Sequence, residues 1–599
     1  MRGQGHGLRH LVLPWSLLLV ALAAGACGEA AQPAATPTRP PAVAATPTTA
    51  PTATPTTAPA VVATPTRAPT ATPTPAGVQP KYGGVAAFAH RGDPSSWDSM
   101  FDTNVNTTLP DAPIFGDRAL LKPCRNNSFQ LCPYLAESWE SNSEATVWTF
   151  KVREGVFWHD GKALAADDIK WWLELLINGA PGGRPPAKQA ATLGPVQGIE
   201  VVGGSRLRIT LLTPVVQFPA LLSSPNLSIQ HPRHLMQSQI EKGNGTVAPN
   251  EVGWVGTGPF KMAKYDKGVV IRVRKFDRYW EKDEQGRQLP FLDGIDFVIM
   301  TEGSSVFAAF RTGRLHRTAV GEGFYLVPQQ REIIKREFGD QAWIAKYPPF
   351  GSLTGINASK PPMSDVRVRQ AVSMWLDRNS YIRAVYNGDG EPAAVFAPGS
   401  PYANPGFIEW PGWNPKTKEQ DRKRARELLA EAGYPTGFKA TVLARAGRTG
   451  SAEWLVGDLA GLLGEGNLRI AAVDSATYTN RICQGDFDLI QPVSAGVIDR
   501  DSPELLAAGY SSKNRCSYVK HNDEKVDKAF ERIAATRDDK ERVRLAQELE
   551  RYLSIETWLA VNMSVEAVYV AYKSEVNGWP VPQWNPTNNG DYATTWLAR

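Results

Sequence analysis

The chain alternates between two hydrophobic periods along its length. In the N-terminal half, apolar and polar residues alternate with a period of two over residues 147–153, and a Gly-Gly turn separates two further apolar runs at 199–202 and 207–212. These patterns predict half-buried strands joined by tight turns. Between them, apolar side chains recur at helical spacing after Asp167, which is a candidate helix cap. This half therefore predicts a mixed α and β structure.

Helical spacing dominates the C-terminal half of the chain. Apolar residues three or four positions apart mark helices over 368–375, 425–432 and 545–553. Short apolar runs that fit strands lie between them, for example at 440–443 and 559–562. An alternation of strands and helices is typical of a sheet that is covered by helices. The two halves together predict an α/β fold with two lobes.

The N-terminus has the pattern of an export signal. Arg2 and Arg9 precede an apolar run over residues 11–24, which is too short to span a bilayer because a transmembrane helix needs roughly 20 residues. The run ends in Ala-Gly-Ala-Cys27, which resembles a bacterial lipobox. We expect removal of residues 1–26 and a lipid on Cys27 that anchors the protein to the outer face of the cell membrane. The alternative is an ordinary signal that is cleaved near the same point and leaves Cys27 unmodified.

Residues 27–80 have the composition of a tether. The tetrapeptide Ala-Thr-Pro-Thr occurs five times in this segment, and its only charged residues are Glu29, Arg39 and Arg67. Proline removes backbone donors, and alanine and threonine offer too little apolar area to offset the entropy lost on ordering. We therefore expect an extended, unpacked segment that holds a folded domain away from the membrane.

The charge of the chain argues against nucleic acid as a partner. The formal net charge is +5 over 599 residues, and basic and acidic residues alternate instead of forming long blocks. Such charges are better explained as a solvated surface. Beyond the N-terminal run, no apolar stretch of the sequence is long enough for a transmembrane helix, so membrane attachment depends on Cys27.

Four cysteines remain once Cys27 is set aside, namely Cys124, Cys132, Cys483 and Cys516. An even number in an exported protein favours disulfides. Of the three possible connectivities, the pairing of sequence neighbours, Cys124 with Cys132 and Cys483 with Cys516, is the least entangled, and we expect it. Metal binding is less favoured, because neither pair has the Cys-x-x-Cys spacing and the histidines are scattered.

Motifs of the common catalytic sites are missing from the sequence. It contains no phosphate-binding Gly-x-x-x-x-Gly-Lys-Ser/Thr loop, no His-Glu-x-x-His zinc motif and no Gly-x-Ser-x-Gly nucleophile motif. Helix capping and loop solvation explain the carboxylate pairs Asp167/Asp168 and Asp499/Asp501 better than a glycosidase site does. The sequence thus predicts no catalytic residues, no metal and no cofactor.

Several motifs occur in the order and spacing of one known family. They lie at residues 133–140, 148–162, 256–260, 357–371 and 425–435, and the last reads Ala-Arg-Glu-Leu-Leu-Ala-Glu-Ala-Gly-Tyr-Pro. The chain after its tether resembles the bacterial extracellular solute-binding proteins of family 5, the oligopeptide, dipeptide and nickel type that serve ABC importers. This resemblance implies an α/β, two-lobed, class-II periplasmic-binding-protein-like fold. An inserted α+β subdomain would belong to lobe I, and the ligand would be enclosed between the lobes.

The resemblance also implies the limits of the lobes. The expected segments are 81–109, 252–303 and 563–599 for lobe I, 110–251 for the inserted subdomain, and 304–562 for lobe II. The chain would cross between the lobes near Gly303 and near Asn562. These crossings would form the hinge, where a few residues absorb the closing rotation.

Ligand-binding residues are implied in the same way. In peptide-binding members, an aspartate in the loop after the Gly-Asp-Phe-Asp segment anchors the amino group of the ligand; here Asp499 is the first candidate and Asp501 the second. Further contacts are expected from the cleft-lining strand and from lobe I, namely from Phe350, Leu353, Trp97 and Phe115. Two departures from the family are present: the tryptophan common in this loop is missing, and residues 311–316 lack the Gly-Glu-x-Asp that many relatives carry.

The sequence therefore predicts a binding protein and not an enzyme. We expect a monomeric receptor that captures a peptide-like solute and delivers it to the transmembrane subunits of an ABC permease. An oligosaccharide is the alternative ligand for the same fold, favoured by the 18 tryptophans. Two other classes stay open: a secreted carbohydrate-active enzyme on a Thr/Pro linker, and a purely structural surface lipoprotein.

Overall fold

The structure is a computed structural model that describes residues 79–598 with gaps. The gaps are residues 95, 99–104, 117–118, 126–129, 181–182, 184–185, 188–189, 191–192, 224–230, 246, 321–323, 447–448, 495–502 and 580–591. The signal segment, Cys27 and the tether lie outside the described residues. Within the described ranges, no helix combines the length and the apolar character needed to cross a membrane.

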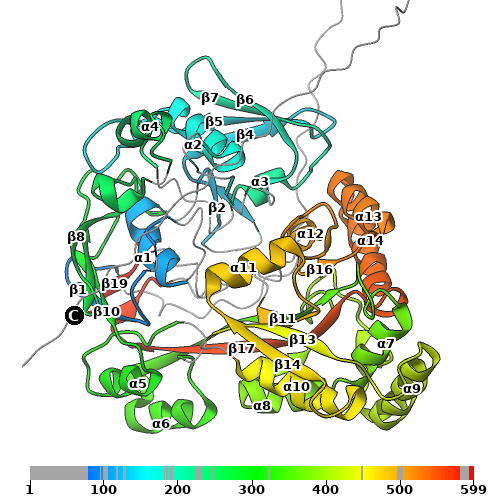
Figure 1. Cartoon of the computed structure of the whole chain (residues 1–599). Helices are drawn as coiled ribbons and strands as arrows, with labels where there is room; N and C mark the ends of the chain where they lie inside the picture. Colours follow the sequence, from blue (N-terminus) through cyan, green and yellow to red (C-terminus); the bar gives the residue numbers. More distant parts are fainter. Residues whose placement is uncertain are drawn as a thin grey trace, which may run out of the picture. The chain divides into compact units, whose positions relative to one another are not determined.

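One sheet has four strands in the order β1-β10-β9-β8 (Figure 1). Its strands are β1 (Val85–His90), β8 (Phe260–Asp266), β9 (Val270–Lys275) and β10 (Gly294–Ile299). β1 is parallel to β10, and the other two pairs are antiparallel. Helix α1 (Val105–Phe115) packs against β8 and β9. A two-stranded ribbon, β18 (Val576–Asn577) with β19 (Trp596–Leu597), contributes Val576 and Leu597 to the same core.

A glycine-rich turn brings the chain close to the end of α1 before β8 begins. The backbone N–H of Gly258 donates to the carbonyl of Ile114 at 2.9 Å. A Cβ atom on Gly256 or Gly258 would collide with carbonyl oxygens at this helix end. The two glycines are therefore required because only a residue without a side chain allows this backbone approach.

His159 packs against the same turn and is partly buried. Its Nε2 lies 3.0 Å from the carbonyl oxygen of Gly258, and its Nδ1 accepts the backbone N–H of Gly256 at 3.3 Å. These two bonds fit the neutral ring with its proton on Nε2. Burial lowers the pKa of His159 to about 4, because the charged form cannot be hydrated there.

Residues 121–241 contain a second sheet with its own hydrophobic core. The elements of this region are β2 (Leu121–Pro123), β3 (Leu131–Pro133), β4 (Ala136–Ser141), β5 (Val147–Val152), α2 (Ala166–Asn178), β6 (Val196–Val202), β7 (Arg206–Leu211), α3 (Phe218–Leu221) and α4 (Arg233–Glu241). Four of the strands form an antiparallel sheet in the order β4-β5-β7-β6. β5 and the β6–β7 hairpin confirm the strands predicted from alternation, since Trp148, Phe150 and Val152 are buried.

Helix α2 confirms the predicted helix but corrects its cap. The N-cap is Ala165, and the carboxylate of Asp168 at the third helical position accepts the backbone N–H of Ala165 at 2.9 Å. Asp167 is exposed and caps nothing. An acid at the third position can satisfy a free N–H of the first turn and lies near the positive end of the helix, which explains the choice of Asp168.

The largest sheet has seven strands and belongs to the C-terminal half. Its order is β12-β17-β11-β15-β13-β14, with β16 paired to β11. The strands are β11 (Ala342–Asn357), β12 (Gly390–Pro392), β13 (Ala440–Arg445), β14 (Leu468–Val473), β15 (Leu489–Ser494), β16 (Val519–Lys520) and β17 (Val561–Lys573). The predicted strand at 440–443 is confirmed by β13.

Ten helices of the described residues accompany this sheet (Figure 1). They are α5 (Gly303–Arg311), α6 (Pro328–Phe338), α7 (Val366–Trp375), α8 (Arg378–Tyr386), α9 (Lys418–Glu431), α10 (Gly450–Leu463), α11 (Ser475–Gln484), α12 (Pro503–Tyr510), α13 (Glu524–Ala535) and α14 (Asp539–Arg551). Short helical turns are η2 (Pro249–Val252), η3 (Gly339–Gln341), η4 (Phe407–Glu409), η5 (Pro415–Thr417) and the π-helical η6 (Tyr552–Glu556). The three helices predicted in this half are confirmed by α7, α9 and α14.

The strands β11 and β17 connect the cores of the two larger sheets. They pair antiparallel from Ala342 opposite Lys573 to Thr354 opposite Val561, with two register shifts. Near the first of these pairs, their side chains join one hydrophobic cluster with Phe88 of β1 and other residues of the four-stranded sheet. The two sheets therefore share a core at one end of β11 and β17. The expected lobe limits, which divide the chain at residue 562 within β17, stay a prediction.

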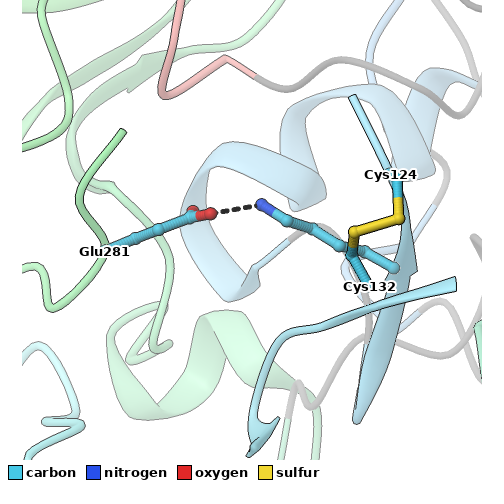
Figure 2. Close-up of a disulfide and its surroundings, with 4 residues drawn as sticks. Cys124, Cys132 and Glu281 are labelled. Atoms are coloured by element: carbon cyan, nitrogen blue, oxygen red, sulfur yellow. Dashed lines mark hydrogen bonds and ion pairs between the residues drawn. A yellow bond between two sulfur atoms is a disulfide. The ribbon is translucent and has the colours of Figure 1, made fainter. Parts of the chain in front are cut away.

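The four cysteines form two disulfides, in the pairing expected from the sequence. Cys124 is bonded to Cys132, and Cys483 is bonded to Cys516. Beside the first disulfide, the Nζ of Lys122 lies 2.5 Å from a carboxylate oxygen of Glu281. Figure 2 shows the Glu281 side chain pointing toward the ribbon that carries Cys124 and Cys132. The guanidinium of Arg125 donates to the same carboxylate at 2.8 Å. The buried carboxylate of Glu281 thus connects the disulfide-bonded ribbon β2–β3 to the segment that follows β9.

Candidate functional site

A short segment at residues 316–318 joins the two larger sheets through its backbone. The N–H of Ala89 in β1 donates to the carbonyl of Arg317 at 3.1 Å, and the N–H of Lys573 in β17 donates to the carbonyl of His316 at 2.9 Å. The segment therefore lies between β1 on one side and β17 on the other. Together with β11 and β17, it makes the link between the sheets continuous.

The side chain of Arg317 is completely buried at this link. Its guanidinium carbon lies 4.4 Å from the ring centre of Phe88 and 5.1 Å from that of Trp579. In the part of the chain that the structure describes, none of its three nitrogens has a hydrogen-bond partner. Nor does any described carboxylate form an ion pair with it. Arg317 is therefore a buried cation that has aromatic contacts alone.

Two tyrosines complete the surroundings of this guanidinium. The hydroxyl groups of Tyr347 and Tyr572 are hydrogen-bonded to each other, and Nε1 of Trp579 donates to the Tyr347 hydroxyl at 3.1 Å. Burial raises the pKa of both tyrosines. Both hydroxyls thus stay protonated at neutral pH and do not neutralise Arg317. We call Phe88, Arg317, Tyr347, Tyr572 and Trp579 the junction cluster.

Residues 142, 143 and 216 contact the end of α13 and the residues after it at a second place. The backbone N–H of Val216 donates to the carbonyl of Ala534 at 2.9 Å. The guanidinium of Arg537, which follows α13, donates to the carbonyls of Asn142 and Ser143 at 3.0 and 2.8 Å. We call these the seam contacts. They connect residues expected in lobe I with residues expected in lobe II.

Three of the predicted ligand-binding side chains lie in hydrophobic cores. Trp97 makes edge-on contacts with Trp254 and Tyr265, each with ring centres 5.4 Å apart. Trp97 and Phe115 share the cluster that contains most of the junction cluster, whereas Leu353 packs in another cluster. The structure thus brings Trp97 and Phe115 together and leaves Leu353 apart. Their contact with a ligand stays a prediction.

The other predicted site residues cannot be placed in the same way. Asp499, Asp501 and Cys27 lie outside the described residues, and so does the side chain of Phe350, whose backbone belongs to β11. The loop that holds both aspartates follows β15, which pairs with β11. These assignments stay predictions.

Arg317 is the residue that the reading of the sequence missed. It stands in the run Leu-His-Arg-Thr-Ala-Val, in which most neighbours are apolar or small. A lone arginine in such a run could have suggested a buried charge, but its missing partners depend on the tertiary packing.

Among the described residues, no group of three or more acids, histidines or cysteines is placed to hold a metal ion.

The fold defines a class of protein, the two-lobed α/β periplasmic binding proteins. A periplasmic binding protein associated with an ABC transporter of Helicobacter pylori, solved with a bound peptide, superimposes with a TM-score of 0.72 at 22% identity. The match covers 87% of this chain and 99% of that one. The two-lobed α/β prediction is thereby confirmed.

The chain belongs to the bacterial extracellular solute-binding proteins of family 5, because the sequence model of the middle region of that family matches residues 130–515. The glutathione-binding protein of Pectobacterium atrosepticum is 27% identical over 317 residues, which are 53% of this chain and 56% of that protein. The dipeptide-binding protein of Escherichia coli is 25% identical over 380 residues, 61% of this chain and 65% of that protein. The chain thus spans somewhat more than half the length of these relatives. The resemblance read from the sequence is confirmed.

Proposed function

We propose that the chain is the extracytoplasmic receptor of an ABC import system, which captures a peptide-like solute and delivers it to a membrane permease. The family match over residues 130–515 carries this proposal. It is supported by relatives that are named for binding glutathione and dipeptides. The similar structure from Helicobacter pylori holds a peptide.

The proposed mechanism is a hinged closure that the solute stabilises. The lobes would be divided at the links between the sheets, namely residues 316–318, β11 and β17, which would bend as the lobes move. The crossings expected near Gly303 and Asn562 stay a prediction. The seam contacts fit a closed arrangement, because they join the two expected lobes away from these links. A solute that touches both lobes only when they are closed shifts the population toward closure by its difference in affinity for the two states.

The remaining parts of the proposal concern the cell surface. Residues 1–26 would be a lipoprotein signal, Cys27 would carry the lipid, and residues 27–80 would form the tether to a monomeric receptor. The permease subunits would be its protein partners. No bond would be broken in the solute, so the protein would not be an enzyme. Since these relatives are named for binding glutathione and dipeptides, the oligosaccharide receptor and the carbohydrate-active enzyme are not favoured.

Native mass spectrometry tests the proposal directly. The purified chain is sprayed under native conditions, denatured, and any released molecule is identified. We expect peptides, and an added peptide at a hundred times its Kd should raise the free energy of unfolding by about 2.7 kcal/mol. A sugar among the released molecules, or the absence of a stabilising peptide in a panel of di- to pentapeptides, would contradict the peptide receptor.

A further inference from the structure

The uncompensated charge of Arg317 needs a physical explanation. A guanidinium carries five N–H donors, and burying them without acceptors is strongly unfavourable. The rings of Phe88 and Trp579 attract the cation but replace neither the lost water nor a counter-ion. The neighbouring hydroxyls of Tyr347 and Tyr572 are bonded to each other.

Another buried arginine of the same chain shows how a purely structural guanidinium is accommodated. Arg378 is also fully buried and also lies over a tryptophan, with Trp413 at 3.9 Å. Its nitrogens, however, donate to the carbonyls of Asn562, Ser373 and Gly412 at 2.7–3.1 Å. The fold therefore supplies acceptors where an arginine only supports packing. At Arg317 it supplies none among the described residues.

We propose that Arg317 is the binding group for a carboxylate of the cargo, which supplies the two acceptors that the described residues do not provide. This inference rests on the proposed receptor function and specifies the class of solute: one that bears a carboxylate. A carboxylate matches the guanidinium fork with two parallel hydrogen bonds, and the pair is strongest away from water. The carboxylate belongs either to the C-terminus of a peptide or to an acidic side chain.

The position of Arg317 offers a route for the anion. Its cover comes from both sheets, because Phe88 belongs to β1, whereas Tyr347 and Tyr572 belong to β11 and β17. A rotation of one sheet against the other at residues 316–318 would separate these covers and expose the guanidinium. Closure around a bound carboxylate would then pair the charge. In this way the binding of an anion favours the closed arrangement.

The first measurement compares matched peptides by calorimetry on the full chain. The probes are di- to pentapeptides with a free C-terminus, the same peptides as C-terminal amides, and amides that contain one glutamate. For the wild-type chain we expect at least tenfold weaker binding of plain amides. Full recovery with the glutamate amides would assign a side-chain carboxylate to Arg317, and no recovery would assign the C-terminus. Equal binding of acids and plain amides would overturn the inference and leave the peptide receptor intact.

Three variants separate a binding role from a structural one. R317M should bind acids and amides equally, while R317K, which keeps the charge but not the fork, should retain a reduced preference. R331M is the control, because Arg331 also lies over an aromatic ring, Tyr569 at 3.8 Å, but is already paired with Asp389 at 2.6 and 2.9 Å. R331M should keep the wild-type preference for acids. A preference that survives in R317M would overturn the inference.

A measurement without peptide keeps the two proposals apart. Because R317M removes an unpaired buried charge, its melting temperature without ligand should equal or exceed that of the wild type. A clear decrease, as expected for R378M, would make Arg317 structural and overturn the inference. Succinate, a small dicarboxylate, should raise the melting temperature of the wild type but not of R317M. If succinate acts and no peptide does, the peptide function fails while the carboxylate site stands; if neither acts, the carboxylate site is overturned as well.

Discussion

Replacing Arg378 with methionine should destabilise the protein by about 3 kcal/mol. The substitution keeps most of the buried length of the side chain but removes its hydrogen bonds to Asn562, Ser373 and Gly412. The carbonyl of Gly412 keeps a second donor, the ammonium group of Lys418 at 2.9 Å. The carbonyls of Asn562 and Ser373 lose a donor in a buried environment.

The magnitude follows from these losses. A buried acceptor left without its partner costs about 1–3 kcal/mol, so two of them cost about 2–6 kcal/mol. The lost contact with the Trp413 ring adds about 1–2 kcal/mol. Removing a charge from a dry site offsets part of the cost, since burial has already lowered the pKa of Arg378 to about 9. The expected net loss of about 3 kcal/mol therefore lies at the lower end of the summed costs of about 3–8 kcal/mol.

Equilibrium unfolding in urea measures this loss. We expect a lower transition midpoint for R378M with an unchanged slope, because the surface exposed on unfolding stays the same. R331M, which breaks an ion pair with partial exposure, serves as the control and should lose about 1 kcal/mol or less. If R378M unfolds at the same urea concentration as the wild type, the view that buried acceptors depend on Arg378 is refuted.

Three further predictions concern other parts of the fold. As the pH is lowered from 6.5 to about 4, His159 alone should reduce the free energy of unfolding by about 1.4 kcal/mol per pH unit. In this range the His159 ring binds a proton in the unfolded chain but not in the folded chain. Urea unfolding at a series of pH values should show a weaker dependence on pH for H159Q. G256A should lose more than about 2 kcal/mol in the same assay because its Cβ meets backbone, whereas G457A, in open space within α10, should gain about 0.5–1 kcal/mol; equal effects would contradict the close approach. Removing the disulfide Cys483–Cys516, which spans 33 residues, should cost about 3.7 kcal/mol, and removing the other, which spans 8, should cost about 2.5 kcal/mol. The reverse order in thermal melts would argue against loop entropy as the cause.

The helices and strands that were predicted correctly follow from local patterns of apolar and polar residues. The alternation in 147–153 reports one buried face, and β5 buries Trp148, Phe150 and Val152 as expected. The cap of α2 was misplaced because Asp167 and Asp168 are equivalent candidates in sequence. Which of them accepts the N–H of Ala165 depends on where the helix begins, and this is set by the burial of Ala166 and Ile169.

The site was less accessible to prediction, because it depends on contacts between distant segments. The junction cluster joins three stretches of the chain, near residue 88, over 317–347 and over 572–579, and each stretch is more than two hundred positions from the next. The aromatic character of its members was visible, but the lack of a partner for Arg317 appears only when all neighbours are in place. The family resemblance directed attention to Asp499 and Asp501 instead, and it gave no reason to consider an arginine between the sheets.

The seam contacts have a consequence for how the protein can vary. Val216, Asn142 and Ser143 take part through backbone atoms, and so does Ala534, whereas only Arg537 contributes a side chain. Backbone groups are supplied by any residue other than proline in the donor position. The seam hydrogen bonds at these four positions therefore survive a change of side chain, whereas the two bonds of Arg537 are lost when its guanidinium is removed.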